Sequence, residues 1–204
     1  MGDASGNIIY AFFQLAYMKQ KIILASQSPR RKQLLEWADI PFEVIVSDAD
    51  ESYPEGLSYG ETAIHIARNK ALAVKNNQHV SKIIIAADTI VICDKVIIGK
   101  PLDKEDAIKI IRKLSGKTHE VVTGVFICDA EKEISFAETT EVTFHELTED
   151  QIIYYVDKYQ PYDKAGAYAI QEWIGVIGIE KINGDFYNVM GLPVSKVIKA
   201  LDTF

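Results

Sequence analysis

Several protein classes are excluded by what this chain has little of. Its 204 residues include only two cysteines and four scattered histidines, too few for a disulfide framework or a zinc cluster. The apolar stretch at residues 8–17 is too short to span a bilayer as a helix. The net charge of −7 argues against a general nucleic-acid binder, because phosphate backbones require basic surfaces. We therefore expect a soluble, cytoplasmic protein whose partners are neither nucleic acids nor membranes.

Both cysteines lie in apolar runs. Cys93 ends the run TIVIC, Cys128 ends the run GVFIC, and neither belongs to a CxxC pair. Reduced cysteine behaves as a small apolar residue and is frequently buried. We therefore expect two reduced core cysteines.

The rest of the composition is that of an ordinary globular protein, with 48% apolar and 25% charged residues. No internal repeat or low-complexity linker divides the chain, so residues 18–204 are expected to form a single domain. Residues 1–17 are expected to be an extension outside the fold. Met18 then opens MKQKIILAS, which reads as the start of a first strand, and no Lys or Arg precedes the apolar stretch as in a secretory signal.

Hydrophobic periodicity and capping residues predict an α/β fold with a mixed sheet. The Asp94-Lys95 and Asn183-Gly184 pairs are expected to turn hairpins. The predicted strands are 21–25, 42–46, 82–93, 96–98, 119–128 and 133–145. The predicted helices are 29–38 behind Ser28, 61–75, one from Asp103 to Gly116, one from the capping box Thr148-x-x-Gln151 to Tyr159, and one starting near Pro193.

The first candidate site is the segment Ser26-Gln27-Ser28-Pro29-Arg30-Arg31. Two arginines in the first turn of a helix are unfavourable for the helix alone, because its N-terminus already carries partial positive charge. Free backbone N–H groups, the hydroxyls of Ser26 and Ser28 and two guanidiniums would together bind phosphate oxygens. The alternative is that Ser28 merely caps the helix and that Arg30 and Arg31 are solvated.

The second candidate is Asp88, in the strand segment Ala86-Ala87-Asp88-Thr89. A carboxylate in an otherwise apolar strand must be protonated, paired or bound to a metal, because a buried unpaired charge is costly. Asp88 is therefore a candidate general base or metal ligand. A structural aspartate bonded to the backbone is the alternative.

The third candidate is the acidic run around Asp48, Asp50 and Glu51. Closely spaced carboxylates suit a hard cation such as Mg²⁺, although an acidic surface loop is the ordinary explanation. Lys70 and Lys100, considered alone, would face solvent. Gly116-Lys117-Thr118 is not a phosphate-binding P-loop, because the pattern requires glycine at the position of Ile111.

Taken together, the motifs resemble the Maf family of nucleotide pyrophosphatases, from residue 21 to the C-terminus. The matching segments are LASQSPRRKQLLE (24–36), SDADES (47–52), ARNKA (67–71), IIAADTIV (84–91), IIGKP (97–101), LSGKTHEVVTGV (114–125), DKAGAYAIQ (163–171) and INGDFYNVMGLP (182–193). The resemblance implies a Maf/ITPase-like fold, with an elongated twisted sheet, flanking helices and two lobes around a central cleft. It also implies a divalent metal, Mg²⁺ or Mn²⁺, and a homodimer.

The resemblance further implies roles for individual residues. Asp88 matches the family's proton acceptor and Asp50 its acidic residue before the second helix, with the adjacent Glu51 as the alternative for the latter. Lys70 and Lys100 match phosphate-binding lysines. The substrate-selecting positions match Arg30, Thr89 and Gln171, a combination that resembles the subfamily acting on dTTP and UTP.

These expectations combine into one mechanism. Cationic side chains would neutralise a triphosphate, the metal held by Asp50 or Glu51 and by Asp88 would bridge its oxygens, and Asp88 would direct water at the α-phosphorus, releasing pyrophosphate. Thr89 and Gln171 would each offer a donor and an acceptor to a pyrimidine. A nucleotide-binding regulator of septum formation with little turnover, and a phosphomonoesterase, remain as alternatives.

Overall fold

The protein, analysed as a computed structural model, is described over residues 22–46, 48–78 and 82–204. The expectations for residues 1–17, Met18, Lys21 and Ser47 lie outside these ranges. The strands are β1 (Ile22–Leu24), β2 (Phe42–Val44), β3 (Ile83–Cys93), β4 (Val96–Ile98), β5 (Thr118–Cys128), β6 (Glu133–Phe144) and β7 (Ile179–Asn183). The helices are α2 (Pro29–Trp37), α3 (Tyr59–Gln78), α4 (Lys104–Leu114), α5 (Glu149–Tyr159), α6 (Trp173–Gly178), α7 (Phe186–Met190) and α8 (Val194–Leu201), with a 3₁₀ turn, η1, at Ala165–Ala167.

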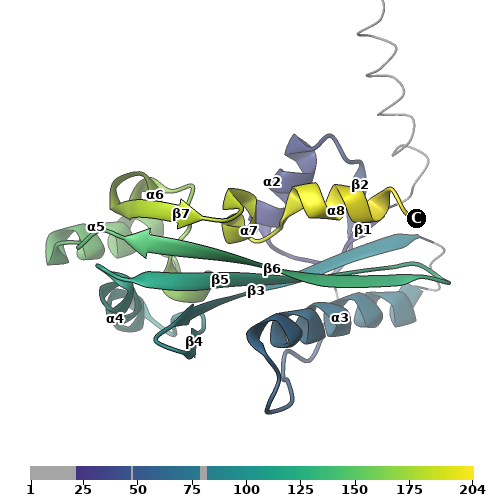
Figure 1. Cartoon of the computed structure of the whole chain (residues 1–204), viewed down its shortest axis with the longest axis horizontal. Coiled ribbons are helices and arrows are strands. Elements are labelled where there is room, and N and C mark those ends of the chain that lie inside the picture. Colours follow the sequence, from purple (N-terminus) through teal and green to yellow (C-terminus); the bar gives the residue numbers. More distant parts are fainter. Residues whose placement is uncertain (1–21, 47, 79–81) are drawn as a thin grey trace, which may run out of the picture.

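The strands form one mixed sheet in the order β2-β1-β3-β5-β6-β7, with β4 added beside β3. β1 is parallel to both β2 and β3, whereas the other pairings are antiparallel. Figure 1 shows the long strands β3, β5 and β6 running the length of the molecule, with helices on both sides of the sheet. The expected α/β class with an elongated, mixed, helix-flanked sheet is confirmed.

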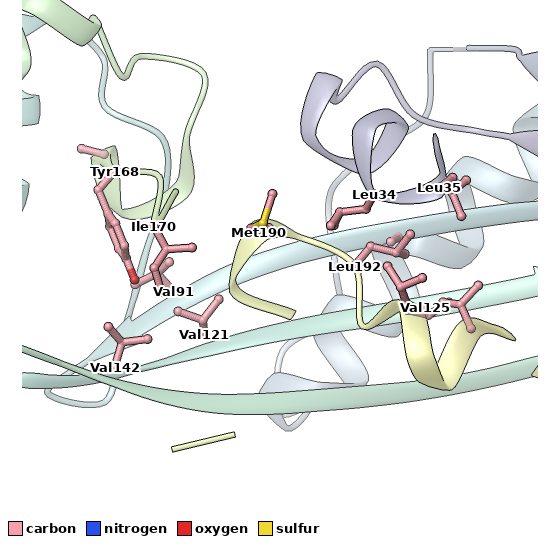
Figure 2. Packing of buried hydrophobic residues seen from close by; sticks show 14 of the residues in the cluster. Leu34, Leu35, Val91, Val121, Val125, Val142, Tyr168, Ile170, Met190 and Leu192 are labelled. Carbon is pink, nitrogen blue, oxygen red and sulfur yellow. The ribbon is translucent and has the colours of Figure 1, made fainter. Parts of the chain in front are cut away.

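Residues of β3 alternate between two apolar layers, as the period of a strand requires. Ile83, Ile85, Ala87 and Val91 belong to the larger core cluster, which α2, α4, α5 and α8 help to bury. Ile84 and Ala86 face the other way, against Ala67, Ala71 and Val74 of α3. Figure 2 shows Met190 between two parts of the larger cluster, Leu34 and Leu192 on one side and Tyr168 and Ile170 on the other.

One edge of β3 is paired with β5 almost throughout, whereas its second edge is only partly paired. On this second edge, β1 pairs with Ile83–Ile85 and β4 pairs with Val91–Cys93. Within the described ranges, no strand pairs with this edge across residues 86–90. Asp88 and Thr89 lie in that gap, which leaves room for a ligand beside the strand.

Three predicted helix starts are confirmed by their capping residues, whereas α3 begins at Tyr59, two residues before the expected Glu61. Ser28 accepts a hydrogen bond from the backbone N–H of Arg31, with proline at the first helical position. Asp103 caps α4, and Thr148 with Gln151 forms the expected capping box of α5. Both cysteines are buried and free. None of the helices in the described part of the chain combines the length and apolar character needed to cross a bilayer.

The expected hairpin at Asn183-Gly184 is wrong. β7 ends at Asn183, and the chain continues into the short helix α7 instead of a return strand. Asp185 caps α7 by accepting a bond from the N–H of Tyr187. Asn188 anchors the helix to the sheet, because its amide nitrogen donates to the carbonyl of Val121 and to the hydroxyl of Thr140. These long-range contacts, absent from any local pattern, select the helix.

Candidate active site

A cavity of about 450 Å³ lies at the uncovered edge of β3. It is bordered by the start of α2, by β3, by the segment 163–169 and by residues 189–191. Part of its lining comes from the apolar core: Val91, Val121, Tyr168 and Met190. The lining also contains four cationic and four acidic side chains: Arg30, Arg31, Lys70, Lys100, Asp48, Glu51, Asp88 and Asp163.

The start of α2 faces this cavity, and Ser26, Ser28, Arg30 and Arg31 all line it. The hydroxyl oxygen of Ser26 accepts from the N–H of Ser28, and that of Ser28 caps the helix. Arg30 forms an ion pair of 3.5 Å with Asp163, which also lines the cavity. Burial would raise the pKa of Asp163, but hydrogen bonding to Lys164 and the charge of Arg30 hold it below its usual value.

Arg31 is buried and has internal partners for each of its nitrogens. Nε donates to the carbonyl of Gly191 at 2.8 Å, and the two terminal nitrogens donate to Ser26 at 3.1 Å and Thr89 at 3.0 Å. Gly191 adopts a φ of +114°, which favours glycine, and so places its carbonyl at this guanidinium. The side chain thus ties α2, β3 and the α7–α8 connection together. Its expected contact with phosphate stays a prediction.

Asp88 is paired with a lysine of α3, which packs on the face of the sheet to which Asp88 projects. Lys70 of α3 donates to Asp88 at 2.6 Å and to Glu51 at 2.8 Å, so one ammonium joins the two carboxylates. The hydrogen bond from Lys70 lowers the pKa of Glu51, and the opposing effect of burial offsets this only in part. Asp88 and its neighbour Thr89 project to opposite faces, and both reach the cavity because the edge between them is open.

The structure separates the remaining predicted residues. Glu51 lines the cavity, whereas Asp50 does not and accepts two hydrogen bonds from Ser52. Lys100 lines the cavity with an exposed side chain. Gln171 is exposed and is not among the lining residues, because the chain turns toward α6 after Ala169 and Ile170. Its role in choosing the base stays a prediction.

Several lining residues were missed from the sequence. Asp163, Tyr168 and Met190 lie in segments that the motif comparison includes, but nothing in their local pattern indicates a ligand site. Thr123, which is not a lining residue, was also missed: it is fully buried in β5, directly opposite Thr89 in the register, and its hydroxyl contacts that of Thr89 at 2.9 Å. Only the pairing of β3 with β5 brings the two threonines together.

Tyr168 lines the cavity, and its hydroxyl contacts Nε2 of the buried His119 at 2.8 Å. Burial lowers the pKa of His119 from 6.5 to about 4. Between these values the unfolded chain binds more protons than the folded one, so stability falls as the pH is lowered through this window. We expect this histidine to account for about 3 kcal/mol of the loss in unfolding free energy.

Urea unfolding of the wild type and of His119→Gln between pH 7 and pH 4 measures this contribution. Glutamine keeps a hydrogen-bonding group near Tyr168 but does not titrate. The variant should lose less stability on acidification, whereas His145→Gln, at an exposed histidine, should follow the wild type. Identical pH dependences for wild type and His119→Gln would contradict the assignment.

The polar lining has balanced formal charge, with as many acidic as cationic groups. A triphosphate adds several negative charges, so neutralising it requires further positive charge from a cation. A phosphorylated ligand whose apolar part lies on Val91, Val121 and Met190 would therefore bind together with a cation.

Comparison with known proteins identifies relatives that match most of this chain. A relative from Parabacteroides distasonis named dTTP/UTP pyrophosphatase is 50% identical over 187 residues, covering 91% of this chain and 97% of the relative. One from Cytophaga hutchinsonii with the same name is 53% identical over 181 residues, covering 89% and 83%. Among solved structures, the Ham1 protein of Staphylococcus aureus has a TM-score of 0.42 and 17% identity, covering 61% of this chain and 72% of that chain.

The family comparison covers the whole described domain. Residues 21–204 match the family described as Maf-like protein. With this match and relatives at about half identity over nine-tenths of its length, the chain belongs to the Maf family.

Proposed function

We propose that this chain hydrolyses dTTP and UTP to the nucleoside monophosphate and pyrophosphate. The relatives bearing that activity in their names are 50% and 53% identical to it. The observation within this chain that carries the proposal is one cavity with two kinds of lining. Its apolar floor, formed by Val91, Val121 and Met190, adjoins a cluster of cations and carboxylates. A nucleotide has the same division, between its base and its phosphates.

In this proposal the phosphates lie at the start of α2. Backbone N–H groups of the first helical turn and the partial positive charge of the helix favour an anion there. Arg30 and Lys100, which both line the cavity, add positive charge, and the hydroxyls of Ser26 and Ser28 add donors. Arg30 would exchange its 3.5 Å contact with Asp163 for a phosphate oxygen.

Asp88 is the proposed proton acceptor. Its carboxylate lines the cavity and receives one hydrogen bond from Lys70, which leaves its other oxygen available to a water molecule. A water held there would be directed at the α-phosphorus, and its proton would pass to Asp88 as pyrophosphate leaves. Lys70 keeps the carboxylate in place through its bonds to Asp88 and Glu51.

The residues present fit a divalent cation. Glu51 and Asp88 each use one oxygen on the same ammonium, at 2.8 Å and 2.6 Å, so the two carboxylates lie close together and each has a second oxygen that could bind a metal ion. Mg²⁺ usually takes one or two protein carboxylates and completes its shell with water and phosphate oxygens. We assign Glu51, rather than Asp50, as the partner of Asp88, because Asp50 is engaged by Ser52 outside the cavity lining. When bound, Mg²⁺ or Mn²⁺ would neutralise phosphate charge and polarise the phosphoryl group.

Product analysis in ¹⁸O-labelled water tests the proposal. The chain is incubated with UTP, dTTP, CTP, ATP and GTP, each with Mg²⁺ or Mn²⁺, and the products are separated by ion-exchange chromatography and mass spectrometry. We expect pyrophosphate and monophosphate from UTP and dTTP. Attack on the α-phosphorus should place the ¹⁸O in the monophosphate.

Other products would contradict the proposal in distinct ways. Orthophosphate with nucleoside diphosphate would indicate cleavage of the terminal phosphate, and ¹⁸O in pyrophosphate would indicate attack on the β-phosphorus. Tight nucleotide binding without turnover under either metal would favour the regulator over the enzyme. Glu51→Gln should raise the metal concentration needed for half-maximal rate, whereas Asp50→Asn should leave it close to that of the wild type.

A further inference from the structure

A chain of hydrogen bonds leads from the cavity into the sheet. A terminal nitrogen of Arg31 donates to the hydroxyl oxygen of Thr89 at 3.0 Å. The Thr89 hydroxyl contacts that of Thr123 at 2.9 Å, and the Thr123 hydroxyl donates to the backbone carbonyl of Asn188 at 3.1 Å. Thr89 lines the cavity, whereas Thr123 is fully buried behind it.

The two ends of this series of hydrogen bonds fix the direction of every bond in the series. A guanidinium can only donate and a carbonyl can only accept, while a hydroxyl has one hydrogen and two acceptor sites. Thr123 uses its hydrogen on the carbonyl of Asn188, so it must accept the hydrogen of Thr89. The reverse orientation of the two threonines would forfeit one buried hydrogen bond, at a cost of about 0.5–1.5 kcal/mol.

Thr89 therefore offers the cavity an acceptor and no donor. Its hydrogen points to Thr123 and one acceptor site is taken by Arg31, which leaves the second acceptor site for a ligand. This differs from the expectation that Thr89 would present both a donor and an acceptor. A ligand group at this position must be an N–H or an O–H.

The side of the sheet on which Thr89 lies indicates which part of a nucleotide this is. Thr89 projects to the same face of β3 as Val91, whose side chain is part of the apolar floor, and away from the face of Asp88 and Lys70. A base on the apolar floor would thus be the group next to Thr89. Uracil and thymine both carry an N–H at ring position N3, where cytosine has a lone pair.

We infer that Thr123 is a positioning residue for base selection: it orients the Thr89 hydroxyl as an acceptor, which favours a pyrimidine with an N3–H. The inference rests on the proposed function and names how the same cavity distinguishes its substrates. A site that accepts a hydrogen bond from N3 disfavours a base with a lone pair there, since two acceptors would then face each other.

Replacing Thr123 with valine tests this inference. Valine has nearly the shape of threonine but leaves the Thr89 hydrogen free to rotate toward the ligand. The readout is the ratio of kcat/KM for UTP to that for the pyrimidin-2-one nucleoside triphosphate, which has an unprotonated N3 and no exocyclic amine. We expect UTP to be preferred about tenfold or more by the wild type, and the ratio to fall about fivefold to tenfold in Thr123→Val.

Two further variants separate orientation from general damage. Thr123→Ser keeps the hydroxyl and should retain the wild-type ratio. Thr118→Val removes an exposed hydroxyl from the same strand, where Thr118 pairs with Thr143 at 2.8 Å, and should also retain it. Loss of activity toward both substrates alike would reflect structural damage and would overturn the positioning role.

The result also separates this inference from the proposed function. If the wild type releases no pyrophosphate from UTP, the proposed function fails. If UTP is hydrolysed normally but the wild type uses both substrates equally, or the ratio in Thr123→Val stays within twofold of the wild type, only the inference about Thr123 fails. If Thr123→Val does not fold, the wild-type comparison still tests whether Thr89 acts as an acceptor, and equal use of the two substrates would overturn the inference.

Discussion

Replacing Asp88 with asparagine should lower kcat by about 100-fold or more, with a much smaller effect on KM. Asparagine has nearly the same shape but cannot take a proton from water. Lys70 would keep its 2.8 Å contact with Glu51, so the cationic lining of the cavity should remain in place. The loss should therefore appear in the chemical step and not in substrate binding.

Steady-state pyrophosphate release with UTP, together with equilibrium binding of a non-hydrolysable analogue, separates these two effects. Asp94→Asn is the matched control, because Asp94 follows the last residue of β3 and pairs with Lys117 at an exposed position. Its turnover should equal that of the wild type. Near-normal turnover of Asp88→Asn would remove Asp88 from the role of proton acceptor and leave it as a partner of Lys70.

Replacing Gly124 with alanine should destabilise the fold by about 3 kcal/mol or more, which corresponds to roughly 10 °C in Tm for a chain of this size. Gly124 lies in β5, under the backbone of α3. An added Cβ would lie 2.2 Å from the carbonyl carbon of Ala63 and from the nitrogen of Ile64. Backbone atoms cannot rotate away as a side chain can, so the helix itself must shift.

Chemical denaturation of Gly124→Ala and Gly99→Ala measures the effect against a matched substitution. A Cβ at Gly99 meets no atom within 4 Å, so that variant should be close to the wild type in stability. Because α3 carries Lys70, we also expect Gly124→Ala to lose activity at temperatures where it is still folded. A change in stability below 1 kcal/mol would show that α3 can separate from the sheet at little cost.

The helix starts were predictable because the responsible contacts are local. Ser28, Asp103 and Thr148 each bond a backbone N–H within three residues, so the sequence pattern contains the whole interaction. The long buried strand β3 was predictable for a similar reason, since a run of β-branched residues by itself indicates a strand. The same local reasoning failed at Asn183-Gly184, where α7 is held by bonds from Asn188 to strands far away in the sequence.

The candidate site divides in the same way. Sequence alone singled out Asp88, Arg30 and Arg31, because a carboxylate in an apolar strand and cations at a helix start are each unfavourable without a partner. It could not assign different uses to the two arginines. In the structure Arg30 faces the cavity beside Asp163, while Arg31 is held by Gly191, 160 positions away.

By itself, then, the sequence determined the α/β class, the family and most of the groups that carry charge in the cavity, Asp163 excepted, since these follow from residue type and short-range spacing. Tertiary structure decided the gap at the edge of β3, which of Glu51 and Asp50 lines the cavity and which partners the Thr89 hydroxyl has. Each of these depends on strand pairing or on a hydrogen bond between distant segments, and such contacts exist only once the chain has folded.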